Sequence, residues 1–217
     1  GYRRQVAAAA PVRAGPGHGS SPIGTYEKLV EAHRAGRLDF SQVRTVNLDE
    51  YCGLSGDNPP KLPVLYGEAP VQPGEPPPGE HPSANGAAPD MEAEARRYEA
   101  LVESLGYADL QLLGIGHNGH IGFNEPCESF PAAVHPVELT ESTIQANSRL
   151  FDRVEDVPTR AITMGDWHHL KGPAHPAHRR GGQAGDCGKG PHRPVTPWVP
   201  ASVLQLHRDV TVITCGE

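Results

Sequence analysis

A glycine-rich stretch of the chain carries residue types that suit proton transfer. In LLGIGHNGHIGFNEP (residues 112–126), an apolar run ends at Gly114, and Asn118, His120 and Glu125 follow it within a few residues. Histidine titrates near neutral pH, and a neighbouring carboxylate or amide sets its orientation and charge. These three side chains therefore form a candidate proton relay. The GxGxxG-like spacing alone equally fits a glycine turn whose histidine only packs.

A second stretch, VNLDEYCGL (residues 46–54), offers a candidate base. Its apolar residues predict a buried strand that ends at Asp49 and Glu50. Since ligands bind at the carboxyl ends of strands in an open parallel sheet, we expect Asp49 and His120 to face one cleft.

The elements that would position these residues alternate between helix and strand. A helix is expected over residues 25–35, and a second over residues 91–105, with Asp90 as its N-cap and Gly106 as its stop. The second helix leads into the strand that ends at Gly114, and the β-branched run at residues 210–215 predicts a further buried strand. This order indicates one α/β domain over residues 1–217, with a Rossmann-like, doubly wound, mostly parallel sheet covered by helices on both faces.

Two further segments could bind an anion. Gly19, Ser20 and Ser21 precede the first helix, where backbone N–H groups and hydroxyls can hold a phosphate. Residues 139–152 predict a capped helix or turn that carries Arg149. Taken alone, the first segment is an ordinary turn and the second holds an ordinary surface charge.

Composition limits the classes of function. The net charge of −7 and the absence of a basic stripe argue against nucleic acid as a partner, and no apolar run is long enough to span a membrane. Four separate cysteines without CxxC spacing favour reduced thiols in a cytoplasmic protein. The first residues do not form a signal peptide, and because the chain begins with Gly1 instead of methionine, we expect it to be incomplete at the N-terminus.

The motifs NLDEY and GHIGFNEP together resemble the glucosamine-6-phosphate deaminase family. The resemblance extends to GSSPIGTYEKLVEAHRAG, NGAAPDMEAEARRYE, LTESTIQANSRLFD and VTPWVPASVLQLH. It implies that Asp49 moves a proton between carbons 2 and 1 of the substrate, and that His120 opens the sugar ring, tuned by Glu125 and position 118. Many relatives have aspartate at that position, so Asn118 should make His120 less basic. The resemblance also implies phosphate binding by Gly19, Ser20, Ser21 and Arg149.

The implied reaction converts glucosamine 6-phosphate to fructose 6-phosphate and ammonia in amino-sugar catabolism, and we class the enzyme as a hydrolase. It needs no metal and no organic cofactor. The expected partner is a small sugar phosphate, with a homo-oligomer left open. Two alternatives stand beside it: a sugar-phosphate isomerase or lactonase of the same fold, and an inactive sugar-phosphate-binding relic.

Three segments depart from both the family and ordinary globular composition: residues 1–18, 61–84 and 165–193. Nine of the 24 residues from 59 to 82 are prolines, and five of the twelve histidines fall in residues 165–193 without zinc-site spacing. Residues 11–18, 61–84 and 165–193 can each be encoded by a nucleotide sequence whose +1 reading frame gives strands and helices like those of the family. In residues 165–193 that frame reads GIGTILKARRILLIAAGGKPEIVAKALTG, and the family's phosphate-binding lysine falls where this chain has Gln183 and Ala184. We therefore expect all three segments to be out of frame, and residues 61–84 and 165–193 to form irregular coil.

Overall fold

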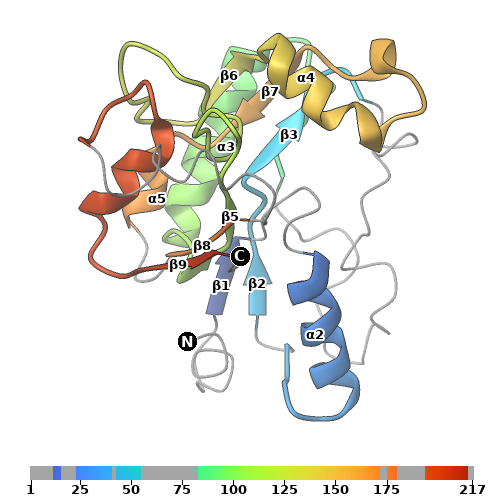
Figure 1. Cartoon of the computed structure of the whole chain (residues 1–217), viewed down its shortest axis with the longest axis vertical. Coiled ribbons are helices and arrows are strands. Elements are labelled where there is room, and N and C mark those ends of the chain that lie inside the picture. The colour runs from blue at the N-terminus through green and yellow to red at the C-terminus, as the bar shows by residue number, and fades with distance from the viewer. Residues whose placement is uncertain are drawn as a thin grey trace.

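The computed structural model describes residues 12–15, 23–40, 43–54, 83–171, 175–179 and 194–214. Its elements alternate between helix and strand through most of the chain (Figure 1). The strands are β1 Val12–Gly15, β2 Val43–Thr45, β3 Asp49–Tyr51, β4 Leu110–Gln111, β5 Leu113–Gly114, β6 His135–Glu138, β7 Arg160–Thr163, β8 His175–Arg179 and β9 Val210–Thr214. The helices are α2 Ile23–Arg34, α3 Met91–Leu105, α4 Glu141–Asn147 and α5 His168–Lys171, with short 3₁₀ turns η1 Ser148–Leu150, η2 Val154–Asp156 and η4 Pro200–Leu206.

Five strand positions form a parallel sheet. β1 pairs with β2 on one side and β4 on the other, and β8 pairs with β5 and β9. Because only Leu112 separates β4 from β5, the two are one interrupted strand that joins both groups. The order is thus β2-β1-β4/β5-β8-β9, the flavodoxin-like doubly wound arrangement. The expected α/β, Rossmann-like class is confirmed.

In this arrangement the strand order reverses between β1 and β4/β5, and ligands bind at the carboxyl ends of the strands beside such a reversal. β1 is followed by the segment that holds Gly19, Ser20 and Ser21, and β5 is followed by the loop that holds His120. The carboxyl ends of β1 and β5 therefore lie at the same edge of the sheet. Residues 19–21 themselves lie outside the described residues.

A second, antiparallel sheet of order β3-β7-β6 lies beyond the end of β2 (Figure 1). The prediction that Asp49 stands at the end of a strand over residues 46–49 was wrong. β2 ends at Thr45, and Asp49 begins β3, where it pairs with Thr163 of β7. Residues 46–48 cross from one sheet to the other, with Val46 and Leu48 buried in the core. An apolar run alone does not distinguish such a buried crossing from a strand.

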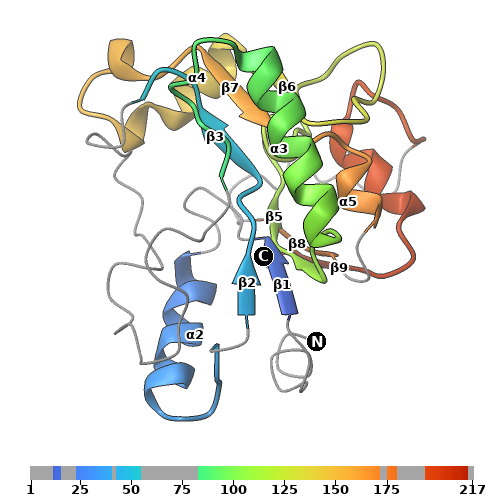
Figure 2. The same ribbon diagram turned by 180° about the vertical axis from the view of Figure 1, so that it is seen from behind.

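Helix α3 fixes the relation between the sheets, and Figure 2 shows it lying in front of the strands. Its bounds are those expected. The Asp90 side chain accepts a hydrogen bond from the Ala93 N–H, and Gly106 ends the helix in the left-handed conformation at φ 80°. Such an N-cap contributes about 1 kcal/mol. Tyr98 packs in the core and donates a hydrogen bond of 2.7 Å to the Asn47 carbonyl in the crossing before Asp49.

Helix α2 spans Ile23–Arg34, close to the expected range. Neither core cluster of the described residues includes any of its side chains. In Figures 1 and 2, α2 and α4 lie at opposite ends of the long axis. β9 also departs from expectation, because Val212 and Ile213 are 40% and 48% exposed and no described element covers them.

The prediction of irregular coil in residues 165–193 was wrong for α5 and β8. β8 supplies the hydrogen-bond partners of both β5 and β9 through its backbone groups, although Pro176 has no N–H to donate. The packing around α5 is unusual, however. Asp166 and His169 are fully buried, and neither Asp166 carboxyl oxygen has a hydrogen-bond partner among the described residues. Residues 55–82 and 180–193 lie outside the described residues.

Candidate active site

The loop after β5 is built around close packing of the His120 ring on Gly116. A methyl group at Gly116 would overlap the imidazole, so glycine is required there. Gly119 adopts φ +87°, and a side chain there would lie 2.7 Å from Val199 Cγ1. The turn is closed by a Gly116 N–H hydrogen bond of 2.9 Å to the His120 carbonyl. The glycine spacing thus lets the His120 imidazole pack directly against the backbone of the loop.

The second half of the loop is tied to β7. The Phe123 N–H donates to Thr163 Oγ1 at 3.2 Å, and the buried Asn124 amide donates to the Met164 carbonyl at 2.9 Å. Thr163 is the residue that pairs with Asp49 across β3 and β7. The loop and Asp49 are therefore held against the same strand.

This arrangement brings Asp49 and His120 together. Asp49 is buried, with only 6% of its surface exposed, and His120 is partly buried. Burial lowers the pKa of His120, whereas the carboxylates of Glu125 and Asp49 act in the opposite direction. The two carboxylates thus lie close enough to the imidazole to act on its charge.

The three relay residues form a continuous hydrogen-bonded chain. The Asn118 amide nitrogen donates to Glu125 Oε2 at 2.6 Å. The Asn118 carbonyl oxygen accepts from the His120 backbone N–H at 3.1 Å and lies 2.7 Å from His120 Nδ1. Since this oxygen can only accept, Nδ1 carries the proton and Nε2 keeps its lone pair. His120 is thereby prepared to act as a base through Nε2.

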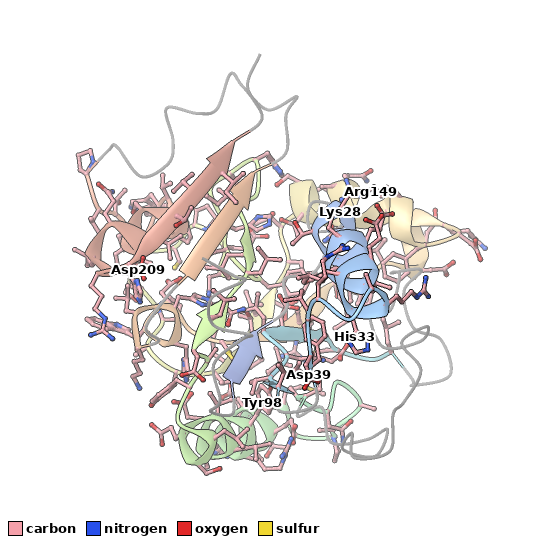
Figure 3. The ribbon with its side chains drawn as sticks, turned by 90° about the horizontal axis from the view of Figure 1, so that it is seen from below. Lys28, His33, Asp39, Tyr98, Arg149 and Asp209 are labelled. Atoms are coloured by element: carbon pink, nitrogen blue, oxygen red, sulfur yellow. The ribbon has the colours of Figure 1, made fainter. Side chains whose placement is uncertain are left out.

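Arg149 is exposed in η1. Burial and the Asp49 carboxylate raise the pKa of Tyr51, while a hydrogen bond with Asn147 and the charge of Arg149 lower it. The Asp49 carboxylate and the Arg149 guanidinium thus both lie close enough to the Tyr51 hydroxyl to act on its charge. Figure 3 views the molecule along its long axis, so Arg149 and Lys28 of α2 overlap there although Figure 1 places their elements far apart.

Sequence reasoning missed two residues that complete the site. Thr143 and Thr140 both donate hydrogen bonds to Glu125 Oε1, and the second of these bonds is 3.1 Å long. Thr140 also caps α4 by accepting from the Thr143 N–H. The repeated threonine in TEST, three residues apart at a helix start, was the available signal.

No group of three or more His, Cys, Asp or Glu side chains in the described part of the chain is arranged to hold a metal ion. No helix there is both long enough and apolar enough to cross a membrane. Cys52 and Cys127 are free thiols.

Residues 14–128 match the family model described as glucosamine-6-phosphate isomerases/6-phosphogluconolactonase. A glucosamine-6-phosphate deaminase of Lachnoclostridium phytofermentans is 48% identical over 200 residues, which cover 92% of this chain and 85% of that protein. The chain belongs to the glucosamine-6-phosphate deaminase family. These deaminases convert glucosamine 6-phosphate to fructose 6-phosphate and ammonia.

Solved structures agree on the fold. A monomeric glucosamine-6-phosphate deaminase has a TM-score of 0.85 and 43% identity, covering 94% of this chain and 85% of that one. A 6-phosphogluconolactonase from Thermotoga maritima has a TM-score of 0.74 at 16% identity, covering 100% of this chain and 90% of that one, and shares the fold. Classing the enzyme as a hydrolase was wrong, because the deaminases act by isomerisation with loss of ammonia.

Replacing Asn118 by aspartate should raise the pKa of His120. The carboxylate would stand at the 2.7 Å position now held by a neutral amide oxygen, and an opposite charge at such a distance favours the protonated imidazole and so raises its pKa. An NMR titration of the His120 ring protons measures the change. Asn85→Asp, which adds the same charge at an exposed turn, is the control, and an unchanged His120 titration in Asn118→Asp would refute the electrostatic account.

Proposed function

We propose that this chain, once its three out-of-frame segments are restored, converts glucosamine 6-phosphate to fructose 6-phosphate and ammonia. The observation that carries the proposal is the convergence of Asp49 and the Asn118–His120–Glu125 relay beside the reversal point of the parallel sheet. A carboxylate and an imidazole with a free Nε2 are the two proton carriers that the reaction needs. The 48% identical relative bears the name of this activity.

The reaction requires three proton movements, and the site has a group for the first two. His120 Nε2 takes the proton of the O1 hydroxyl and returns it to the ring oxygen, which opens the sugar. Asp49 removes the proton from carbon 2 and delivers it to carbon 1, while one proton passes from the amino group to O1, so that the aldose becomes a ketose-type imine. Water then adds to carbon 2 and ammonia leaves, so the product is the ketose phosphate.

Asn118 lowers the basicity of His120 without removing its role in proton transfer. Its amide oxygen holds Nδ1–H, as a carboxylate would, but it contributes no negative charge. His120 is consequently a weaker base than it would be beside an aspartate. A weaker base releases its proton more readily, which favours the return of the proton to the ring oxygen.

Arg149 binds the substrate phosphate, together with Gly19, Ser20 and Ser21. Arg149→Ala should raise the KM for glucosamine 6-phosphate by about 10–150-fold with a smaller change in kcat, because a hydrogen bond between charged groups contributes about 1.5–3 kcal/mol. Steady-state kinetics of ammonia release measure this. Arg153→Ala, which removes an exposed arginine paired with Glu155 in the same region, is the control. Equal KM values for both variants would exclude Arg149 from the phosphate site.

Residues 1–18, 61–84 and 165–193 are out of frame within a single domain. The burial of Asp166 and His169 supports this, since the +1 frame places isoleucine at both positions. The same frame places a lysine at position 183, where this chain has Gln183. The chain as written therefore lacks one phosphate ligand and part of its core. The nucleotide sequence around codons 11, 61, 84, 165 and 193 tests the frame directly.

The experiment that tests the function supplies glucosamine 6-phosphate and measures ammonia and fructose 6-phosphate together. A lactonase would instead hydrolyse 6-phosphogluconolactone without releasing ammonia. A binding protein without activity would gain thermal stability from the sugar phosphate and form neither product. The sugar phosphate is the expected partner, and the homo-oligomer left open by the sequence stays a prediction.

A further inference from the structure

Glu125 is held from two sides. Its Oε2 accepts the Asn118 amide N–H, and its Oε1 accepts the hydroxyls of Thr143 and Thr140. Thr143 is only 1% exposed, so its hydroxyl has no competing water, and it has one proton to give. The orientation of the Glu125 carboxylate therefore depends on the first turn of α4.

The orientation of Glu125 in turn decides which end of the Asn118 amide faces His120. A carboxylate accepts and cannot donate, so it selects the NH₂ end of the amide and leaves the oxygen for His120. If the amide turned over, its NH₂ group would face the His120 backbone N–H, and Nδ1 would have to accept. The proton would then move to Nε2, and the base described above would be lost.

We propose that Thr143 is a positioning residue that holds His120 in the Nδ1–H tautomer, acting through Glu125 and Asn118. Asparagine at position 118 makes this control necessary, because an amide has a right and a wrong orientation whereas a carboxylate accepts through either oxygen. The kinetic consequence of this inference rests on the proposed function. The tautomer itself does not.

The test observes the imidazole nitrogens of His120 directly, in ¹⁵N-labelled chain, by long-range proton–nitrogen correlation. The expected spectrum of the unaltered chain at pH 8 has Nδ1 protonated and Nε2 unprotonated. Thr143→Val, which keeps the shape of the side chain and removes the hydroxyl, should bring a second population with the proton on Nε2. Thr143→Ser should keep the original tautomer, because serine restores the donor.

Ser142→Ala is the matched control, since it removes a hydroxyl from the same helical turn that bonds to Thr140 and not to Glu125. If Thr143→Val does not fold by circular dichroism, the comparison of Thr143→Ala with Thr143→Ser replaces it. A folded Thr143→Val or Thr143→Ala with an unchanged His120 tautomer overturns the proposal.

Turnover provides the second measurement. In the chain with its three segments restored to the shifted frame, and with glucosamine 6-phosphate as substrate, Thr143→Val should lower kcat by about tenfold or more, in line with the loss of a hydrogen bond to a charged group, and should change KM little. Thr143→Ser should restore kcat, and its profile of kcat against pH should match that of the unaltered chain. Absence of activity in every variant, with the tautomer shift present, would refute the deaminase function and leave the role of Thr143 standing.

Discussion

Asp49→Asn should lower ammonia release from glucosamine 6-phosphate by about 10²–10⁴-fold, the contribution typical of a positioned general base. Asparagine keeps the size of the side chain and can hold the same place in β3, where Asp49 is 6% exposed and paired with Thr163. It cannot take a proton from carbon 2. The effect should therefore fall on kcat, while KM changes little. The assay is best made on the chain with its three segments restored to the shifted frame.

The neighbouring residue provides the control for this prediction. Successive side chains on a strand point to opposite faces, so Glu50 points away from Asp49. It accepts hydrogen bonds from the Tyr51 N–H and the Ser83 hydroxyl instead. Glu50→Gln should retain most of the turnover. An Asp49→Asn variant that keeps more than about a tenth of wild-type kcat would remove Asp49 from the shuttle role.

Asp166→Ile should stabilise the chain, and the gain should grow with pH. Burial raises the pKa of Asp166 from its usual 3.8 to about 7, since neither carboxyl oxygen finds a partner among the described residues. The folded state thus keeps the proton while the unfolded state has lost it. Stability from this group is fully present below pH 3.8 and is lost as the pH rises to about 7.

The shift corresponds to about 4 kcal/mol of lost stability above pH 7. The difference in free energy of unfolding between Asp166→Ile and the unaltered chain should therefore increase by roughly 2–3 kcal/mol from pH 5 to pH 8. Urea denaturation at a series of pH values measures it. His169→Ile should add to the stability, because the shifted frame places isoleucine there too.

Asp166→Asn separates the effect of the titrating carboxyl group from the effect of burying a polar side chain. It removes the titration, so its stability should change less with pH than that of the unaltered chain, but it still buries an unpaired polar group and should gain less than isoleucine. Loss of stability in Asp166→Ile at pH 8 would mean that the position is not built for an apolar side chain. The frame hypothesis would then lose its structural support.

Local chemistry made some of this structure predictable. Helix α3 carries its own signals, an acidic N-cap at Asp90 and a glycine stop at Gly106, and its bounds follow from them. The loop at residues 114–125 is similarly encoded by its glycines, because Gly116 leaves room for the His120 ring and Gly119 adopts a positive φ. Asp49, His120, Asn118 and Glu125 were therefore assigned to one site from sequence, and the geometry brings them together.

What the sequence did not show depends on partners distant along the chain. β2 and β3, on either side of the crossing at residues 46–48, belong to different sheets because β2 pairs with β1 and β3 pairs with β7. The residues of β2 and β3 do not by themselves show which partners they will have. Thr143 is significant only because α4 packs against Glu125, 18 residues earlier. β8 forms because β5 and β9 both need hydrogen-bond partners, although its own residues favour neither strand nor core.

The most direct test of the account is the product balance with glucosamine 6-phosphate as substrate, in the chain as written and in the chain with its frames restored. The restored chain should release ammonia and fructose 6-phosphate in equal amounts, and the chain as written should release little of either. A folded, restored chain that binds glucosamine 6-phosphate and releases no ammonia would contradict the account.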